Sequence, residues 1–125
     1  MRRIEVTDRV HEFFRRSEFA CKCGCGFDVV DVELLKVLVM VRTFYKNKVI
    51  VVSGCRCVYH NESIKGASRS QHIFGKAADI VVENQTHEAI YEFLTKCFTT
   101  KYGIGLYSTH VHIDVRSNKA RWGSR

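Results

Sequence analysis

Residues 68–82 read SRSQHIFGKAADIVV and combine a strand pattern with two groups that can bind a metal ion. Residues 77–82, AADIVV, form a short apolar run typical of a buried strand, with Asp79 inside it. His72 precedes Asp79 by seven residues, and Gly75 stands between them. Because glycine adopts turn conformations that other residues avoid, Gly75 can let the chain turn so that both side chains reach one point.

The length of the chain, 125 residues, suits one domain over residues 1–125. There is no proline, and no low-complexity tract or repeat divides the sequence. The N-terminal stretch MRRIEVTDRVHEFF has basic residues without an apolar run behind them, so we expect no secretory signal and synthesis in a cytoplasm. Apolar runs such as VIVV at 49–52 are too short to cross a bilayer. We also expect a monomer.

The segments around this stretch predict an α+β domain with a small, mainly antiparallel sheet and flanking helices. Helical spacing of apolar residues and N-cap residues predict helices at 7–15, 31–46 and 86–97, capped by Thr7, Asp31 and Thr86. Strands are predicted at 49–54, 77–82, 103–107 and 110–115, the last two joined as a hairpin. Residues 19–28, FACKCGCGFD, and residues 55–71 are predicted to be irregular, with a helical turn near Asn61.

Further potential ligands lie on the last predicted strand. His110 and His112 are two residues apart, so their imidazoles point to the same side, and Asp114 continues the row. A catalytic zinc site uses three nitrogen or oxygen ligands and leaves one position open. His72, Asp79 and one histidine of this pair would complete such a set, which can also hold other divalent ions.

Four motifs in this order extend the pattern: SGCRC at 53–57, HN at 60–61, GASRSQHIFGKAADI at 66–80 and GIGLYSTHVHIDVR at 103–116. Together they resemble the zinc D-Ala-D-Ala carboxypeptidase family of metallopeptidases, most of all its small phage and bacterial members. The wider group includes lysostaphin-type peptidases and the hedgehog signalling domain. The resemblance covers roughly residues 17–122. It implies a hedgehog/DD-peptidase-like α+β fold that forms a single zinc peptidase domain.

The resemblance also implies a role for individual residues. The implied zinc ligands are His72, Asp79 and His112. His110 matches a histidine that neighbours the metal without binding it. Arg56 matches an arginine that contacts substrate, and Ser70 matches a serine near the bound substrate.

One position departs from the pattern of several family members, which carry an acidic general base three residues before the last zinc ligand. Thr109 occupies that position and cannot act as a base. His110 is then the first candidate to move protons. Asp114 is the second, although it can instead orient the last zinc ligand through a hydrogen bond. Glu62 and Glu83 remain open as alternatives.

The substrate class that the resemblance implies is the peptidoglycan stem peptide, cut by a D,D-carboxypeptidase or an endolysin-like endopeptidase. The formal charge of +7 suits an anionic cell wall, where the enzyme would act after release or delivery, as a phage or prophage product would. One alternative is a non-catalytic zinc-binding module that binds cell wall or a protein partner. A basic nucleic-acid-binding domain with a cysteine-bound metal is a third reading, but the sequence has no run of five basic residues and no nucleic-acid motif, which disfavours it.

Six cysteines stand at positions 21, 23, 25, 55, 57 and 97. Cys97 stands alone in a predicted helix and is expected to be a buried, small apolar side chain. The other five lack the C-x-x-C spacing of common structural zinc sites, so reduced thiols or a labile disulfide are favoured. Such a disulfide would join the CKCGCG and SGCRC loops and fix Arg56. A structural zinc ion is the third possibility.

Overall fold

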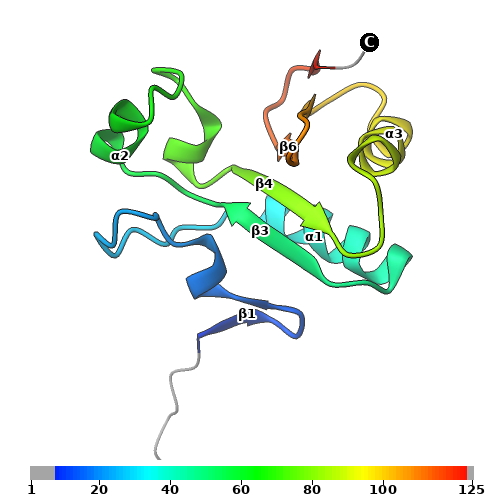
Figure 1. Ribbon diagram of the computed structural model, residues 1–125, viewed down its shortest axis with the longest axis horizontal. Coiled ribbons are helices and arrows are strands. Elements are labelled where there is room, and N and C mark those ends of the chain that lie inside the picture. Colours follow the sequence, from blue (N-terminus) through cyan, green and yellow to red (C-terminus); the bar gives the residue numbers. More distant parts are fainter. Residues whose placement is uncertain (1–7, 124–125) are drawn as a thin grey trace, which may run out of the picture.

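A computed structural model describes residues 8–123 and shows an α+β domain (Figure 1). The helices are α1 (Val32–Tyr45), α2 (Val58–Ser63) and α3 (His87–Cys97), with short 3-10 helices η1 (Arg16–Phe19) and η2 (Gln71–Phe74). The strands are β1 (Arg9–His11), β2 (Phe14–Arg15), β3 (Val49–Ser53), β4 (Ala77–Val82), β5 (Gly103–Leu106), β6 (Val111–Asp114) and β7 (Ala120–Trp122).

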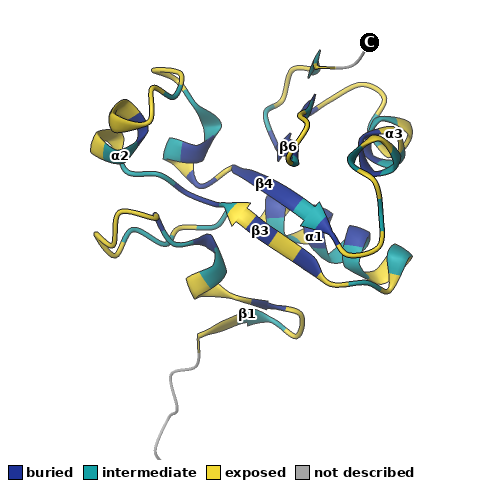
Figure 2. Ribbon diagram, in the orientation of Figure 1, coloured by how far each residue is buried: buried dark blue, intermediate teal, exposed yellow. Residues whose placement is uncertain are grey.

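The main sheet has five strands in the order β3-β4-β6-β5-β7. All neighbouring pairs are antiparallel except β5 and β7, which run parallel. β5 and β6 form the predicted hairpin pair. The predicted α+β class with a small, mainly antiparallel sheet is therefore confirmed, and the fifth strand, β7, was not predicted. β3 alternates buried and exposed residues whereas β4 is buried along most of its length, as their edge and inner positions require (Figure 2).

The core lies between one face of this sheet and the helices α1 and α3. Its fully buried side chains include Leu34, Leu38, Val41, Ile80, Ile90, Leu94, Ile104 and Ile113. Both helices begin where the sequence predicts. The Asp31 side chain accepts hydrogen bonds from the N–H groups of Glu33 and Leu34, and the Thr86 hydroxyl accepts one from Ala89. The helical turn predicted near Asn61 is α2.

The helix predicted at 7–15 is wrong. Thr7 lies outside the described residues, and the segment that follows is a β1–β2 hairpin leading into η1. Asp8 closes this segment, because its carbonyl accepts the N–H of Arg16 and its carboxylate accepts the N–H of Ser17 at 3.2 Å. The hairpin delivers Phe14 to the core, so tertiary burial outweighs local helix propensity here.

A further expectation concerns the exposure of Cys97. Cys97 is exposed at the last position of α3, so its predicted burial is wrong: a residue at a helix end faces solvent when the chain turns away from the core.

Within the part of the chain that the structure describes, none of the helices is long and apolar enough to cross a membrane.

Candidate functional site

The pairing of β4 with β6 brings the first two candidate ligands together. Asp79 and His112 are direct partners in the antiparallel register, and His112 Nδ1 lies 3.1 Å from Asp79 Oδ1. Strand residues alternate between faces, and their neighbours Ile80 and Ile113 belong to the core. Asp79 and His112 therefore project from the opposite face of the sheet.

η2 supplies the third candidate ligand. The Ser70 hydroxyl caps this 3-10 helix by accepting the N–H of His72 at 3.2 Å. Gly75 ends it with a φ of 68°, and a Cβ there would lie 2.7 Å from the carbonyl oxygen of Val29. This turn places His72 Nε2 3.3 Å from Asp79 Oδ1, so the turn predicted at Gly75 is confirmed.

Each of the two histidines has a partner on its other ring nitrogen. His72 Nδ1 lies 2.6 Å from the carbonyl oxygen of Gly54, which can only accept, so Nδ1 donates and Nε2 is the ring nitrogen that faces Asp79. His112 Nε2 lies 2.7 Å from Asp114 Oδ2, which leaves Nδ1 to face Asp79. Three potential ligand atoms thus converge, all within 4.8 Å of one another. Two imidazole nitrogens and one carboxylate oxygen form a donor set that suits Zn²⁺.

The carboxylates of the site are held in their charged form. Burial alone would raise the pKa of Asp79, but hydrogen bonds from His112 and His72 outweigh burial and hold this pKa well below its usual range. Burial would likewise raise the pKa of Asp114, but hydrogen bonds from His112 and Arg116 lower it to about 2. For His112, burial lowers the pKa, yet the hydrogen bonds to both carboxylates raise it above the ordinary value. The site therefore concentrates negative charge around an imidazole, which favours a bound cation.

His110 lies at the rim of the site, immediately before β6. Its Nε2 is 3.8 Å from Asp79 Oδ1, while its Nδ1 is 2.8 Å from the hydroxyl of Thr109. The ring of Tyr107 stacks on the imidazole at a centroid distance of 4.5 Å. Burial lowers the pKa of His110, so it is mainly neutral at neutral pH. Thr109 thus orients the neighbouring imidazole through this hydrogen bond.

Arg56 forms an ion pair with the carboxylate of Asp79. Its Nη2 lies 3.4 Å from Asp79 Oδ2, and its other guanidinium nitrogens lie 3.4 Å from Ser53 Oγ and Asn61 Oδ1. Its backbone N–H donates to the carbonyl oxygen of His72 at 2.9 Å. The loop after β3 is therefore joined to η2 through the backbone of Arg56 and to β4 through its side chain.

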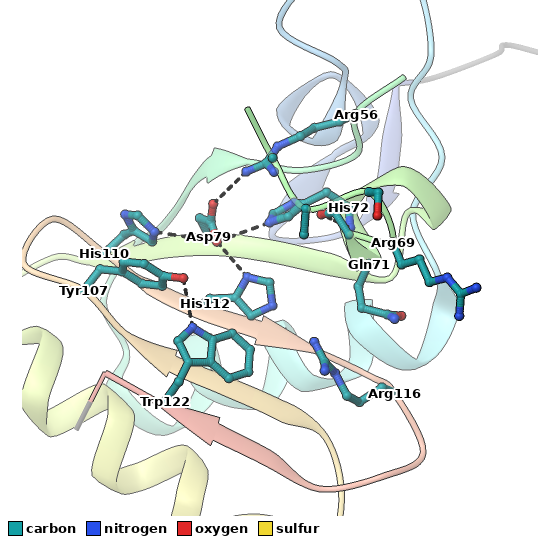
Figure 3. A pocket seen from close by; sticks show the side chains of 14 residues that line it. Arg56, Arg69, Gln71, His72, Asp79, Tyr107, His110, His112, Arg116 and Trp122 are labelled. Carbon is teal, nitrogen blue, oxygen red and sulfur yellow. Dashed lines mark hydrogen bonds and ion pairs between the residues drawn. The ribbon is translucent and has the colours of Figure 1, made fainter. Parts of the chain in front are cut away.

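The candidate ligands lie in the wall of a cleft of about 590 Å³ (Figure 3). Of the residues predicted for the site, Arg56, Ser70, His72, Asp79, His110 and His112 line it. Asp114 is fully buried beneath His112, outside the lining. Figure 3 shows Arg56 and the three histidines gathered around Asp79. Glu62 and Glu83 are absent from this lining.

Several lining residues were missed by the sequence analysis: Arg69, Gln71, Tyr107, Arg116 and Trp122. Trp122 comes from the unpredicted strand β7. Its ring lies 5.0 Å from that of His112, and its Nε1 donates to the Tyr107 hydroxyl at 2.9 Å. A Cβ at Gly105 would lie 2.3 Å from Trp122 Nε1. Gly105 of GIGLY was thus the one sequence signal that a bulky side chain covers β5.

No curated protein and no solved structure matches the chain significantly. A comparison with protein families matches residues 12–114 to the family described as Peptidase M15. The match spans most of the chain and includes every candidate ligand. It agrees with the converging His72, Asp79 and His112, and with the resemblance to zinc D-Ala-D-Ala carboxypeptidases. The chain therefore belongs to the peptidase M15 family.

Proposed function

We propose that this protein is a zinc peptidase in which His72, Asp79 and His112 hold Zn²⁺. The observation that carries this proposal is the convergence of one atom from each residue, with both histidines backed on their second ring nitrogen. Such backing fixes the tautomer and orientation of an imidazole before a metal ion arrives. The fourth position of a tetrahedral ion would face the cleft.

The proposed substrate is a peptidoglycan stem peptide, cut by D,D-carboxypeptidase or endopeptidase activity. Arginine side chains support this choice, since Arg56, Arg69 and Arg116 line the cleft and stem peptides carry carboxylates. The formal charge of +7 favours approach to an anionic wall. We propose that the protein is a monomer, made in a cytoplasm and acting on the cell wall after release or delivery.

His110, Arg56 and Asp114 have distinct proposed roles around the zinc ion. Zinc in such a site supplies Lewis acidity toward the scissile carbonyl and the attacking water. His110 accepts and returns a proton at Nε2, because it is mainly neutral and lines the cleft. Arg56 binds a substrate carboxylate with its planar fork. Asp114, buried and bonded to His112, orients that ligand, and this position argues against its use as a base.

A non-catalytic zinc-binding module is the second candidate function. This candidate is favoured by the identity of residue 109. Thr109 bonds to His110 and provides no carboxylate that could act as a general base three residues before His112. Such a module would bind zinc and peptidoglycan, or a protein partner, without breaking a bond.

Mass spectrometry of purified peptidoglycan after incubation with the protein tests both candidates. Zinc-dependent release of stem-peptide fragments is expected, and the fragment masses identify the bond that is cut. His72→Ala should lose the zinc ion of this site together with fragment release, whereas Cys97→Ser, an exposed change on α3, should keep both. Zinc binding without any fragment would favour the non-catalytic module. Full zinc content in His72→Ala would refute the ligand assignment.

A further inference from the structure

Four cysteines gather where the N-terminal arm, residues 8–28, meets the loop between β3 and α2, residues 54–57. Cys21, Cys23 and Cys25 come from the CKCGCG loop and Cys57 from the SGCRC loop, and their sulfur atoms all lie within 4.8 Å of one another. Cys21 Sγ is 3.4 Å from Cys23 Sγ, and Cys23 Sγ is 3.7 Å from Cys57 Sγ. We infer that these four cysteines form a second, structural metal site that binds Zn²⁺ as a tetrathiolate.

The distances fit this geometry. Zn–S bonds of about 2.3 Å at tetrahedral angles place neighbouring sulfur atoms roughly 3.8 Å apart. The separations of Cys21 Sγ from Cys23 Sγ and of Cys23 Sγ from Cys57 Sγ, 3.4 and 3.7 Å, are close to that value, whereas sulfur atoms joined in a disulfide are only about 2.05 Å apart. All six cysteines are free thiols. A disulfide would engage two of the four sulfurs, whereas one tetrahedral ion engages all of them.

The backbone of the CKCGCG loop is shaped for this convergence. Gly24 and Gly26 have φ values of 81° and 92°, which L side chains rarely adopt. A Cβ at either glycine would meet no described atom within 4 Å, so conformation and not space requires glycine there. Gly24 turns the chain between Cys23 and Cys25, and Gly26 turns it directly after Cys25. Three thiols from a six-residue stretch can therefore reach one point.

Backbone N–H groups also point at the sulfur atoms. The N–H of Cys57 donates to Cys21 Sγ at 3.4 Å, and the N–H of His60 donates to Cys57 Sγ at 3.4 Å. Bonds of this kind stabilise negative charge on sulfur. On binding Zn²⁺, four S–H protons would leave to solvent and four Zn–S bonds would form, with no change in oxidation state.

Cys55 is close in sequence to Cys57 but does not belong to the four-cysteine group. It is buried, and its Sγ donates to the carbonyl oxygens of Phe19 at 3.1 Å and Phe27 at 3.0 Å. Its S–H is thus a packing and hydrogen-bonding group turned toward the N-terminal arm. Cys57 stands one residue after Arg56, so an ion held by Cys57 would clip the N-terminal arm to the loop that carries Arg56. None of the cysteines lines the cleft, so this inference does not depend on the proposed function.

Zinc analysis of protein purified under reducing conditions tests the site. We expect two zinc ions per chain in the wild type, one in Cys23→Ser/Cys57→Ser, and two in Cys97→Ser. The His72→Ala/His112→Ala variant should keep one, so failure of the candidate catalytic site and failure of the cysteine site give different results. Unchanged zinc content in Cys23→Ser/Cys57→Ser would overturn the inference.

Cobalt titration gives an independent readout that needs no cysteine variant to fold. Co²⁺ bound by thiolates produces intense sulfur-to-metal charge-transfer absorption, which a site of two histidines and one aspartate lacks. We expect this absorption in the wild type and in His72→Ala/His112→Ala, and its loss on addition of zinc. Its absence from the wild type would overturn the inference. An intact mass lower by a pair of hydrogens, which reports a disulfide among these cysteines under the same conditions, would also overturn it.

Discussion

Replacing Asp114 by Asn removes a negative charge from beneath the candidate metal centre while nearly preserving the shape of the side chain. Asp114 accepts hydrogen bonds from His112 Nε2 at 2.7 Å and from Nε and Nη2 of Arg116, both at 2.7 Å. It also accepts the backbone N–H of Gly103 at 3.2 Å. An asparagine has one oxygen, so its amide nitrogen must face at least one of these donors inside a fully buried site.

The loss of stability in Asp114→Asn follows both from the pKa of Asp114 and from its hydrogen bonds, and the two values agree. Lowering the pKa of Asp114 from 3.8 to about 2 corresponds to roughly 2.5 kcal/mol in favour of the carboxylate. A hydrogen bond to a charged group contributes about 1.5–3 kcal/mol. We therefore expect Asp114→Asn to lower the free energy of unfolding by about 2–3 kcal/mol at pH 7. Because His112 loses its orienting partner, zinc affinity should also fall by about 10–100-fold.

The pH dependence has a defined sign. Since the pKa of Asp114 is lowered in the folded state, its contribution is fully present above the unfolded value, near 4, and is lost as the pH falls through about 2. The difference in unfolding free energy between wild type and Asp114→Asn should therefore narrow as the pH falls from about 4 to about 2.

Urea unfolding in the presence of a chelator measures the stability, and competition with a chromophoric chelator measures zinc affinity. Glu83→Gln is the matched control, because it also neutralises one carboxylate but at an exposed position. It should change stability by less than about 0.5 kcal/mol. The reasoning is refuted if Asp114→Asn behaves like Glu83→Gln in both assays.

Three further substitutions test the cleft and the turn. His110→Ala should keep its zinc and lower kcat by about 10²–10⁴-fold in a stem-peptide hydrolysis assay; loss of zinc would make His110 a ligand, and an unchanged rate would place the base elsewhere. Arg56→Lys keeps the charge but loses the fork, so kcat/KM should fall by the equivalent of about 1–3 kcal/mol, and an unchanged value would remove Arg56 from the substrate site. Gly75→Ala should cost at least about 1 kcal/mol more in urea unfolding than Gly24→Ala. Both glycines have positive φ, but only at Gly75 would a Cβ meet backbone, at 2.7 Å from Val29; equal costs would contradict this account.

Local patterns predicted the elements whose causes are local. The α1 and α3 helices follow from apolar spacing and from the side chains of Asp31 and Thr86, which reach N–H groups two to three residues away. The N-terminal segment was predicted wrongly because its conformation depends on burying Phe14 against residues distant in sequence. β7 was missed for a similar reason, since a three-residue strand carries no period and forms only by pairing with β5.

Spacing within short segments predicted the turn at Gly75 and the shared side of His110 and His112, whereas the choice of His112 as the partner of His72 and Asp79 came from the family resemblance. Only the tertiary structure decided that Asp114 is buried as a support for His112 and that Trp122 covers one side of the cleft. It also decided that the sulfur atoms of Cys23 and Cys57, 34 residues apart in the chain, lie 3.7 Å from each other. Spacing along a chain limits which neighbours can meet, but contacts between distant segments are set by strand register and by the packing of loops against the sheet, and these exist only once the core has formed.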